Sequence, residues 1–120
     1  MVTTNTIGVG NQAERKTEQY LVNHGYQVVE RNFRSKLGGI DLILEKDNTL
    51  VFVEVRYRAD STRGTPAETV TRNKIGKLIR TAEVFLLKNN QFYEHDCRFD
   101  VIAISDTLTW INGAFTLDDY

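Results

Sequence analysis

Residues 38–58 read GGIDLILEKDNTLVFVEVRYR, and this stretch decides the predicted fold. Two apolar runs flank a polar segment at 46–49, and each run carries one acid in its middle, Asp41 in the first and Glu54 in the second. An Asp-Asn pair between two apolar runs is typical of a two-residue hairpin turn. The stretch therefore predicts two antiparallel strands, each with an acid, although acids are seldom buried without a partner.

The turn also predicts which residues face each other across the hairpin. With Asp47-Asn48 as the turn, Ile43 faces Phe52 and Asp41 faces Glu54, with their Cβ atoms about 4.5–5.5 Å apart. Like charges placed in this way repel each other, and more strongly in apolar surroundings. A divalent cation between the two carboxylates would remove this penalty.

The same face of the second strand is predicted to carry cations. Side chains alternate along a strand, so Glu54, Arg56 and Arg58 share one face. Two carboxylates with a cation beside them indicate a site for metal-assisted hydrolysis. A purely structural alternative stays open, in which Asp41 or Glu54 pairs with Arg56 or Arg98 across the sheet.

The remaining chain predicts helices around this hairpin. We expect a first helix at about 11–24, strands at 26–33, 98–104 and 109–115, and a second long helix with an apolar stripe from Ile75 to Leu86. Thr65 and Thr71 are rival N-caps for the second helix. The order αβββαββ predicts an α/β fold, a single domain over 1–120 with a central mixed β-sheet flanked by helices.

Composition narrows the cellular setting. The chain has 120 residues, of which 41% are hydrophobic and 26% charged, and one cysteine, Cys97. A single cysteine excludes an internal disulfide framework and fits a reducing compartment. The sequence shows neither a signal peptide nor an apolar run of the roughly 20 residues that span a bilayer. We therefore expect a cytoplasmic protein that does not insert into membranes.

The charge is unevenly distributed. The net charge is −1, yet Arg31 to Arg80 contains eleven Lys or Arg against six acids. A basic middle is typical of a polyanion partner, although a solvated face gives the same pattern. We expect nucleic acid, DNA in particular, to be contacted by Lys36, Arg58, Arg63, Arg72, Lys74, Lys77 and Arg80.

Several segments resemble a known family. GGIDLI at 38–43 and LVFVEVRYR at 50–58 resemble the GEIDLI and FVEVKxR segments of the YraN-like family, and RNFR at 31–34 and RFDVI at 98–102 agree as well. This family belongs to the restriction-endonuclease-like, PD-(D/E)xK superfamily, which includes Holliday-junction resolvases. The resemblance covers about residues 8–104. It implies a nuclease-like fold and action on nucleic acid.

The resemblance also implies roles for particular residues. The catalytic positions map to Asp41, Glu54 and Arg56. Asp41 and Glu54 would hold Mg²⁺ or Mn²⁺, and Glu14 matches an acid on the first helix that completes the metal site in resolvase-like relatives.

Two positions depart from the family pattern. The family lysine is Arg56 here, and the family glutamate before Ile40 is Gly39. In the predicted register Gly39 faces Arg56 and leaves room for its guanidinium. Arginine keeps its proton and forms a planar fork, so Arg56 suits a phosphate better than proton transfer.

Three functions follow as alternatives. The first is a Mg²⁺-dependent DNA endonuclease. The second is a nucleic-acid-binding module that kept the fold and lost the chemistry, because Arg56 replaces the motif lysine. The third is a protein-interaction subunit whose basic surface meets an acidic partner.

Overall fold

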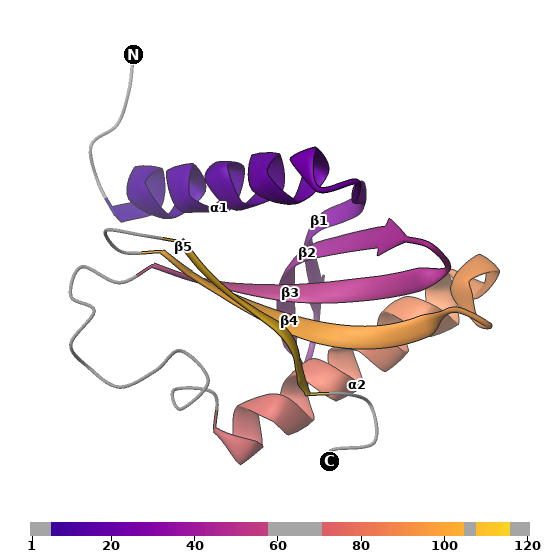
Figure 1. Cartoon of the computed structure of the whole chain (residues 1–120). Helices are drawn as coiled ribbons and strands as arrows, with labels where there is room; N and C mark the ends of the chain where they lie inside the picture. Colours follow the sequence, from indigo (N-terminus) through magenta and orange to yellow (C-terminus); the bar gives the residue numbers. More distant parts are fainter. Residues whose placement is uncertain (1–5, 58–70, 105–107, 116–120) are drawn as a thin grey trace.

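The computed structural model describes residues 6–57, 71–104 and 108–115, and it confirms the predicted order of elements (Figure 1). The helices are α1 (Thr6–Asn23) and α2 (Arg72–Lys88), and the strands are β1 (Gln27–Ser35), β2 (Gly38–Lys46), β3 (Thr49–Tyr57), β4 (Asp96–Ile104) and β5 (Leu108–Phe115). The sequence did not predict the short 3₁₀ helix η2 (Asn90–Phe92). No helix within these described ranges combines the length and apolar character that crossing a membrane requires.

The five strands form one mixed sheet in the order β1-β2-β3-β4-β5. Only the β3–β4 pair is parallel, and the other three pairs are antiparallel. The β2–β3 hairpin turns at Asp47 and Asn48, whose φ angles of 52° and 60° are left-handed as a type I′ turn requires. The predicted register is confirmed where Ile43 pairs with Phe52.

The two helices cover opposite faces of the sheet (Figure 1). Alternation along the strands builds a separate apolar cluster on each face. Ile43 and Phe52 pack with Phe85 of α2, whereas Leu42 and Val53 pack with Leu21 of α1. Both faces of the central hairpin are therefore buried, which is why residues 40–44 and 50–53 are almost continuously apolar.

A buried carboxylate joins β4 to β5 on the α1 side. Asp100 is 1% exposed. It accepts hydrogen bonds from Arg98 Nε at 3.0 Å, from Trp110 Nε1 at 2.8 Å and from the Gly113 backbone N–H at 2.7 Å. Asp100 and Arg98 therefore form an ion pair within β4. The acid is fully partnered, so it has a structural role.

Helix α2 begins after Thr71, one of the two predicted N-caps. The Thr71 side chain accepts a hydrogen bond from the Lys74 backbone N–H at 3.2 Å. The rival cap, Thr65, lies outside the described residues. The cap fixes which residues occupy the first turn of α2, and among them is Lys74.

Replacing Thr71 with alanine should lower the free energy of unfolding by about 1 kcal/mol, because the first turn loses its side-chain acceptor. Urea unfolding of Thr71→Ala measures this loss. Thr71→Ser keeps the hydroxyl and should unfold close to wild type. Equal midpoints for Thr71→Ala and wild type would show that this cap does not contribute.

Candidate functional site

The β2–β3 ladder stops just before the two acids of the hairpin. Its last pair is Leu42 with Val53, so the expected direct pairing of Asp41 with Glu54 does not form. Asp41 Oδ2 instead accepts a hydrogen bond from the Val55 backbone N–H at 2.8 Å. Facing carboxylates repel each other, which accounts for the end of the β2–β3 pairing at this point. By leaving the ladder, Asp41 also gains a backbone hydrogen-bond donor.

An irregularity in β1 lies directly across from Asp41. The pairs Arg31–Leu42 and Phe33–Ile40 place Asn32 opposite Asp41, and Asn32 has a left-handed φ of 52°. Such a φ is uncommon outside glycine, and asparagine is among the residues that tolerate it best. Local breaks in a strand often re-aim a side chain beside an active site. Here the alternation fails too, because Ile40 packs on the α2 face and Leu42 on the α1 face.

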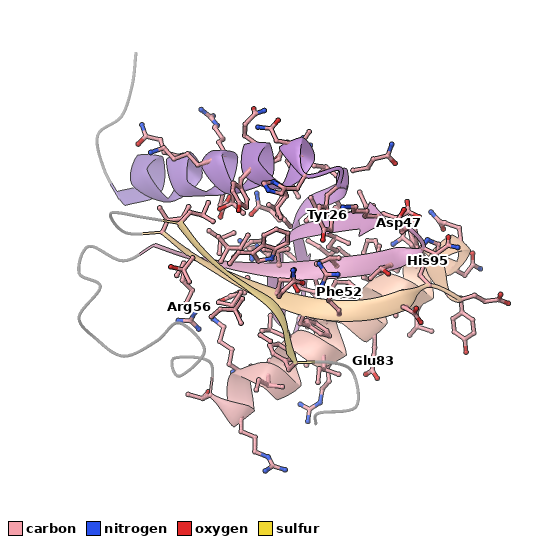
Figure 2. All side chains as sticks on the ribbon, in the orientation of Figure 1. Tyr26, Asp47, Phe52, Arg56, Glu83 and His95 are labelled. Carbon is pink, nitrogen blue, oxygen red and sulfur yellow. The ribbon has the colours of Figure 1, made fainter. Side chains whose placement is uncertain are left out.

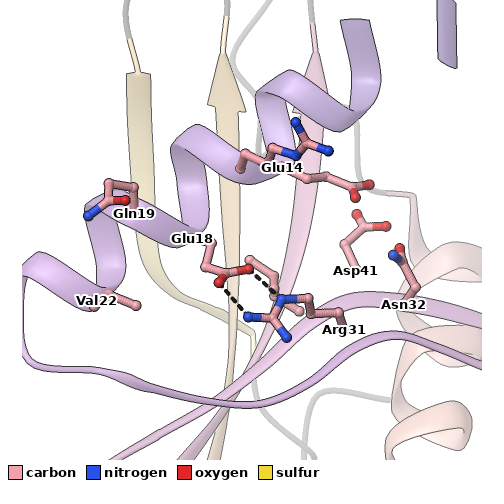
Figure 3. Close-up of a pocket in the computed structure, with 9 residues that line it drawn as sticks. Glu14, Glu18, Gln19, Val22, Arg31, Asn32 and Asp41 are labelled. Atoms are coloured by element: carbon pink, nitrogen blue, oxygen red, sulfur yellow. Dashed lines mark hydrogen bonds and ion pairs between the residues drawn. The ribbon is translucent and has the colours of Figure 1, made fainter. Parts of the chain in front are cut away.

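The three predicted metal ligands act on one another electrostatically. Burial raises the pKa of Asp41 to about 6, the Val55 N–H opposes the shift, and the charges of Glu54 and Glu14 add to it. Figure 3 shows the Glu14 and Asp41 side chains pointing toward one another. Within the described residues, however, no three acids, histidines or cysteines are grouped closely enough to hold a metal ion.

Glu54 lies on the α2 side of the sheet and is already paired with cations. Its Oε2 lies 2.8 Å from Lys74 Nζ, and 3.7 Å from an Arg56 terminal nitrogen. The Glu54 side chain is 11% exposed, so both cations shield a largely buried charge. Arg56 lies at the end of the sheet opposite to the Asp47 turn (Figure 2). Its Nε is buried and has no hydrogen-bond partner among the described residues.

The role expected for Gly39 is wrong. Gly39 pairs with Arg34 of β1, and a Cβ at position 39 would clash with a terminal nitrogen of Arg34. The space left by Gly39 is therefore filled by Arg34 and not by Arg56. The positive charge of Arg34 also acts against the raised pKa of Asp41.

A cleft of about 650 Å³ opens between α1 and the strands β1 and β2 (Figure 3). Glu14, Asn32 and Asp41 line it, together with the ion pair of Glu18 and Arg31. Arg31 donates to both Glu18 oxygens, at 2.8 and 2.6 Å, and this contact lowers the pKa of Glu18. Asp41 is thus reached from the α1 side, while Glu54 is approached from α2.

Only some of the residues predicted to contact nucleic acid lie close together. Lys74 and Lys77 line a smaller cavity of about 310 Å³ beside Gly38 and Gly39, and Leu37 at its rim follows Lys36. Lys36, Arg72, Lys77 and Arg80 are exposed. Arg58 and Arg63 lie outside the described residues. The first turns of α2 and the β1–β2 turn therefore line one cavity, and Lys74 and Lys77 are the cations that line it, here called the basic rim of α2.

Sequence reasoning missed three features of this site. It gave no role to Asn32 or Arg34, although both belong to the RNFR segment. It placed Lys74 on a nucleic-acid surface and not against Glu54. Only asparagine's tolerance of a left-handed φ gave a signal in advance.

The donor set suits a hard cation. Mg²⁺ prefers oxygen ligands and is commonly held by one or two carboxylates together with water and phosphate oxygens. Asp41 and Glu54 can supply two such carboxylates and Glu14 a third. Burial is the main cause of the raised pKa of Asp41, and the charges of Glu54 and Glu14 add to it; a cation would relieve this repulsion. The residues therefore fit such an ion chemically.

These features define a single α/β domain with a five-stranded mixed sheet and an acidic site where its central hairpin opens. The chain belongs to the uncharacterised protein family UPF0102, whose model matches residues 13–104. This confirms the resemblance at the level of the family.

Individual relatives match over nearly the whole chain. A UPF0102 protein of Saccharophagus degradans is 44% identical over 111 residues, covering 92% of this chain and 94% of that protein. One of Vibrio parahaemolyticus is 44% identical over 111 residues, covering 90% and 92%. One of Persephonella marina is 42% identical over 110 residues, covering 91% and 94%.

Proposed function

We propose that this protein is a metal-dependent DNA endonuclease with a restriction-endonuclease-like fold. One observation carries the proposal: Asp41 leaves the hairpin ladder, and burial raises its pKa to about 6, with the charges of Glu54 and Glu14 adding to the rise. Strongly shifted acids in a cleft are typical of functional sites. A structural ion pair would lower the pKa of Asp41 instead.

In this proposal each side chain has a defined task. Asp41 and Glu54 hold Mg²⁺ or Mn²⁺, and Glu14 completes or orients the shell from α1. The metal ion would polarise the phosphate and lower the pKa of a bound water. Arg56 approaches the scissile phosphate with its terminal nitrogens, which form a fork that matches phosphate oxygens.

The test is a cleavage panel with Mg²⁺ or Mn²⁺ on linear, flapped and four-way-junction DNA. Wild type should cleave at least one substrate, and EDTA should stop it. Asp41→Ala controls for a contaminating nuclease, because a contaminant survives the substitution. Cleavage that persists in Asp41→Ala, or none by wild type on any substrate, contradicts the proposal.

A second candidate is a nucleic-acid-binding module without chemistry. Two observations favour it. The charge of Glu54 is already compensated by Lys74 and Arg56, and no group of three possible metal ligands forms among the described residues. The same panel separates the two candidates. Binding of DNA without cleavage of any substrate supports the module.

Both candidates predict salt-dependent binding through the basic rim of α2. Removing one phosphate-binding cation should reduce the slope of log affinity against log salt by about 0.9 on duplex DNA. Lys77→Ala should therefore make the slope shallower by about that amount. Lys88→Ala, which removes the same charge at the far end of α2, is the matched control. An affinity for DNA that does not depend on salt concentration would favour an acidic protein partner over DNA.

A further inference from the structure

Lys74 lies closer to Glu54 than any other cation described in the structure. Its Nζ is 2.8 Å from Glu54 Oε2, a hydrogen-bonded ion pair, and it reaches Glu54 from α2. We infer that Lys74 is the positioning amine of the site: it holds Glu54 and orients the attacking water, in place of the family lysine that is Arg56 here. This inference rests on the proposed endonuclease function.

Arg56 cannot fill that task in its present position. Its terminal nitrogen is 3.7 Å from the same Glu54 oxygen, which is beyond hydrogen-bonding distance. Its Nε is buried and donates no hydrogen bond to the described residues. An ammonium, by contrast, is compact and carries three donors, so Lys74 can hold Glu54 and still offer donors to a water.

The start of α2 places Lys74 where local forces disfavour it. Thr71 caps the helix, which makes Lys74 the third residue of the first turn. A cation in that turn is opposed by the positive end of the helix dipole. The first turn contains no acid to offset this effect. Glu54 on the facing strand β3 compensates this effect, so the position of Lys74 is explained by the site and not by the helix.

Lys74 is also accessible to a substrate. Its side chain is 43% exposed, whereas that of Glu54 is 11% exposed. Lys74 also lines the 310 Å³ cavity beside Gly39. The amine therefore stands between the buried carboxylate and the solvent from which water and DNA arrive.

The reaction is phosphodiester hydrolysis. The water oxygen forms a bond to phosphorus while the bond from phosphorus to the leaving sugar oxygen breaks. The attacking water loses its proton to solvent, and the leaving oxygen takes one from solvent. Lys74 keeps its protons throughout, because its task is to hold Glu54 and to orient the attacking water by donating hydrogen bonds.

The experiment compares Lys74→Met with Lys88→Met in the full chain. Both changes remove one charge from α2 and keep an unbranched apolar stem. Misplacing a reacting group costs about a hundredfold in rate. Lys74→Met should therefore lower kcat about a hundredfold with little change in KM, and Lys88→Met should leave kcat unchanged.

Two further readouts separate positioning from fold support. The double change Arg56→Lys, Lys74→Met moves the lysine to the family position and should recover about tenfold or more in kcat over Lys74→Met, part of the gain that one well-placed group supplies. Calorimetry with Mn²⁺ should show tighter binding to Lys74→Met than to Lys88→Met, because the ammonium no longer competes for Glu54.

The possible failures are distinguishable. If wild type cleaves and Lys74→Met is as active as Lys88→Met, only the Lys74 inference is overturned. Lack of recovery in the double variant, with equal Mn²⁺ affinities, overturns it as well. If wild type cleaves nothing in the panel, the proposed function fails, and the role of Lys74 fails with it.

Discussion

Asp41→Asn is expected to abolish metal-dependent DNA cleavage while making the metal-free protein more stable at neutral pH. An amide is a weaker ligand for a hard cation than a carboxylate is, and a metal ion supplies several kcal/mol of transition-state stabilisation. Since about 1.4 kcal/mol corresponds to a factor of ten, the loss in rate should be at least about a hundredfold.

The gain in stability follows from the pKa of Asp41. Folding raises this pKa from its ordinary value of 3.8 to about 6, so the folded state holds the proton more tightly than the unfolded chain. The free energy of unfolding therefore falls as the pH rises from about 4 to 6, and the loss persists at pH 7. Asparagine does not ionise, so Asp41→Asn should remove this decrease in the free energy of unfolding.

Urea unfolding in EDTA at pH 4, 5, 6 and 7 measures the effect for wild type and Asp41→Asn. The stability difference should grow in favour of the variant across this range. A constant difference would show that Asp41 titrates as an ordinary surface acid. In cleavage assays at limiting Mn²⁺, the wild-type rate should rise through about pH 6 as Asp41 loses its proton.

Asp100→Asn is expected to lower the free energy of unfolding by about 3 kcal/mol or more. The substitution leaves Arg98 without its charge partner, and it turns an amide toward donors such as Trp110 Nε1. Removing one member of a buried charge pair typically costs about 3–5 kcal/mol. Because Arg98 keeps some exposure, the lower end of that range applies.

Asp96→Asn is the matched control, because Asp96 is an exposed acid on the same strand. It should change stability by less than about 0.5 kcal/mol. Equal urea midpoints for the two variants would contradict the structural role of Asp100. The proposed active site makes no use of Asp100, so its loss should act only through the folded fraction.

The sequence predicted the hairpin well because its determinants are local. The Asp47-Asn48 pair selects the turn type, and the turn sets the register that the structure confirms at Ile43 and Phe52. The order of elements followed in the same way from alternating and helical apolar patterns. These features depend on neighbours in the chain and can therefore be predicted without knowledge of the tertiary fold.

The details of the site were not predictable because they depend on other elements. The end of the ladder at Asp41 coincides with a backbone irregularity at Asn32 on β1, and Arg34 of the same strand fills the space at Gly39. The contact between Lys74 and Glu54 depends on how α2 crosses the sheet. Hairpin spacing carries no information on either point, which is why it indicated Arg56 as the relevant cation.

The placement of α1 and α2 on opposite faces of the sheet has a consequence for local unfolding (Figure 1). Glu14 reaches Asp41 from one helix, and Lys74 reaches Glu54 from the other. Detachment of either helix would therefore dismantle the constellation while the strands stay paired. Amide hydrogen exchange resolves such partial openings. The less stable of the two helix dockings, and not the global stability of the sheet, should set the temperature at which the site is lost.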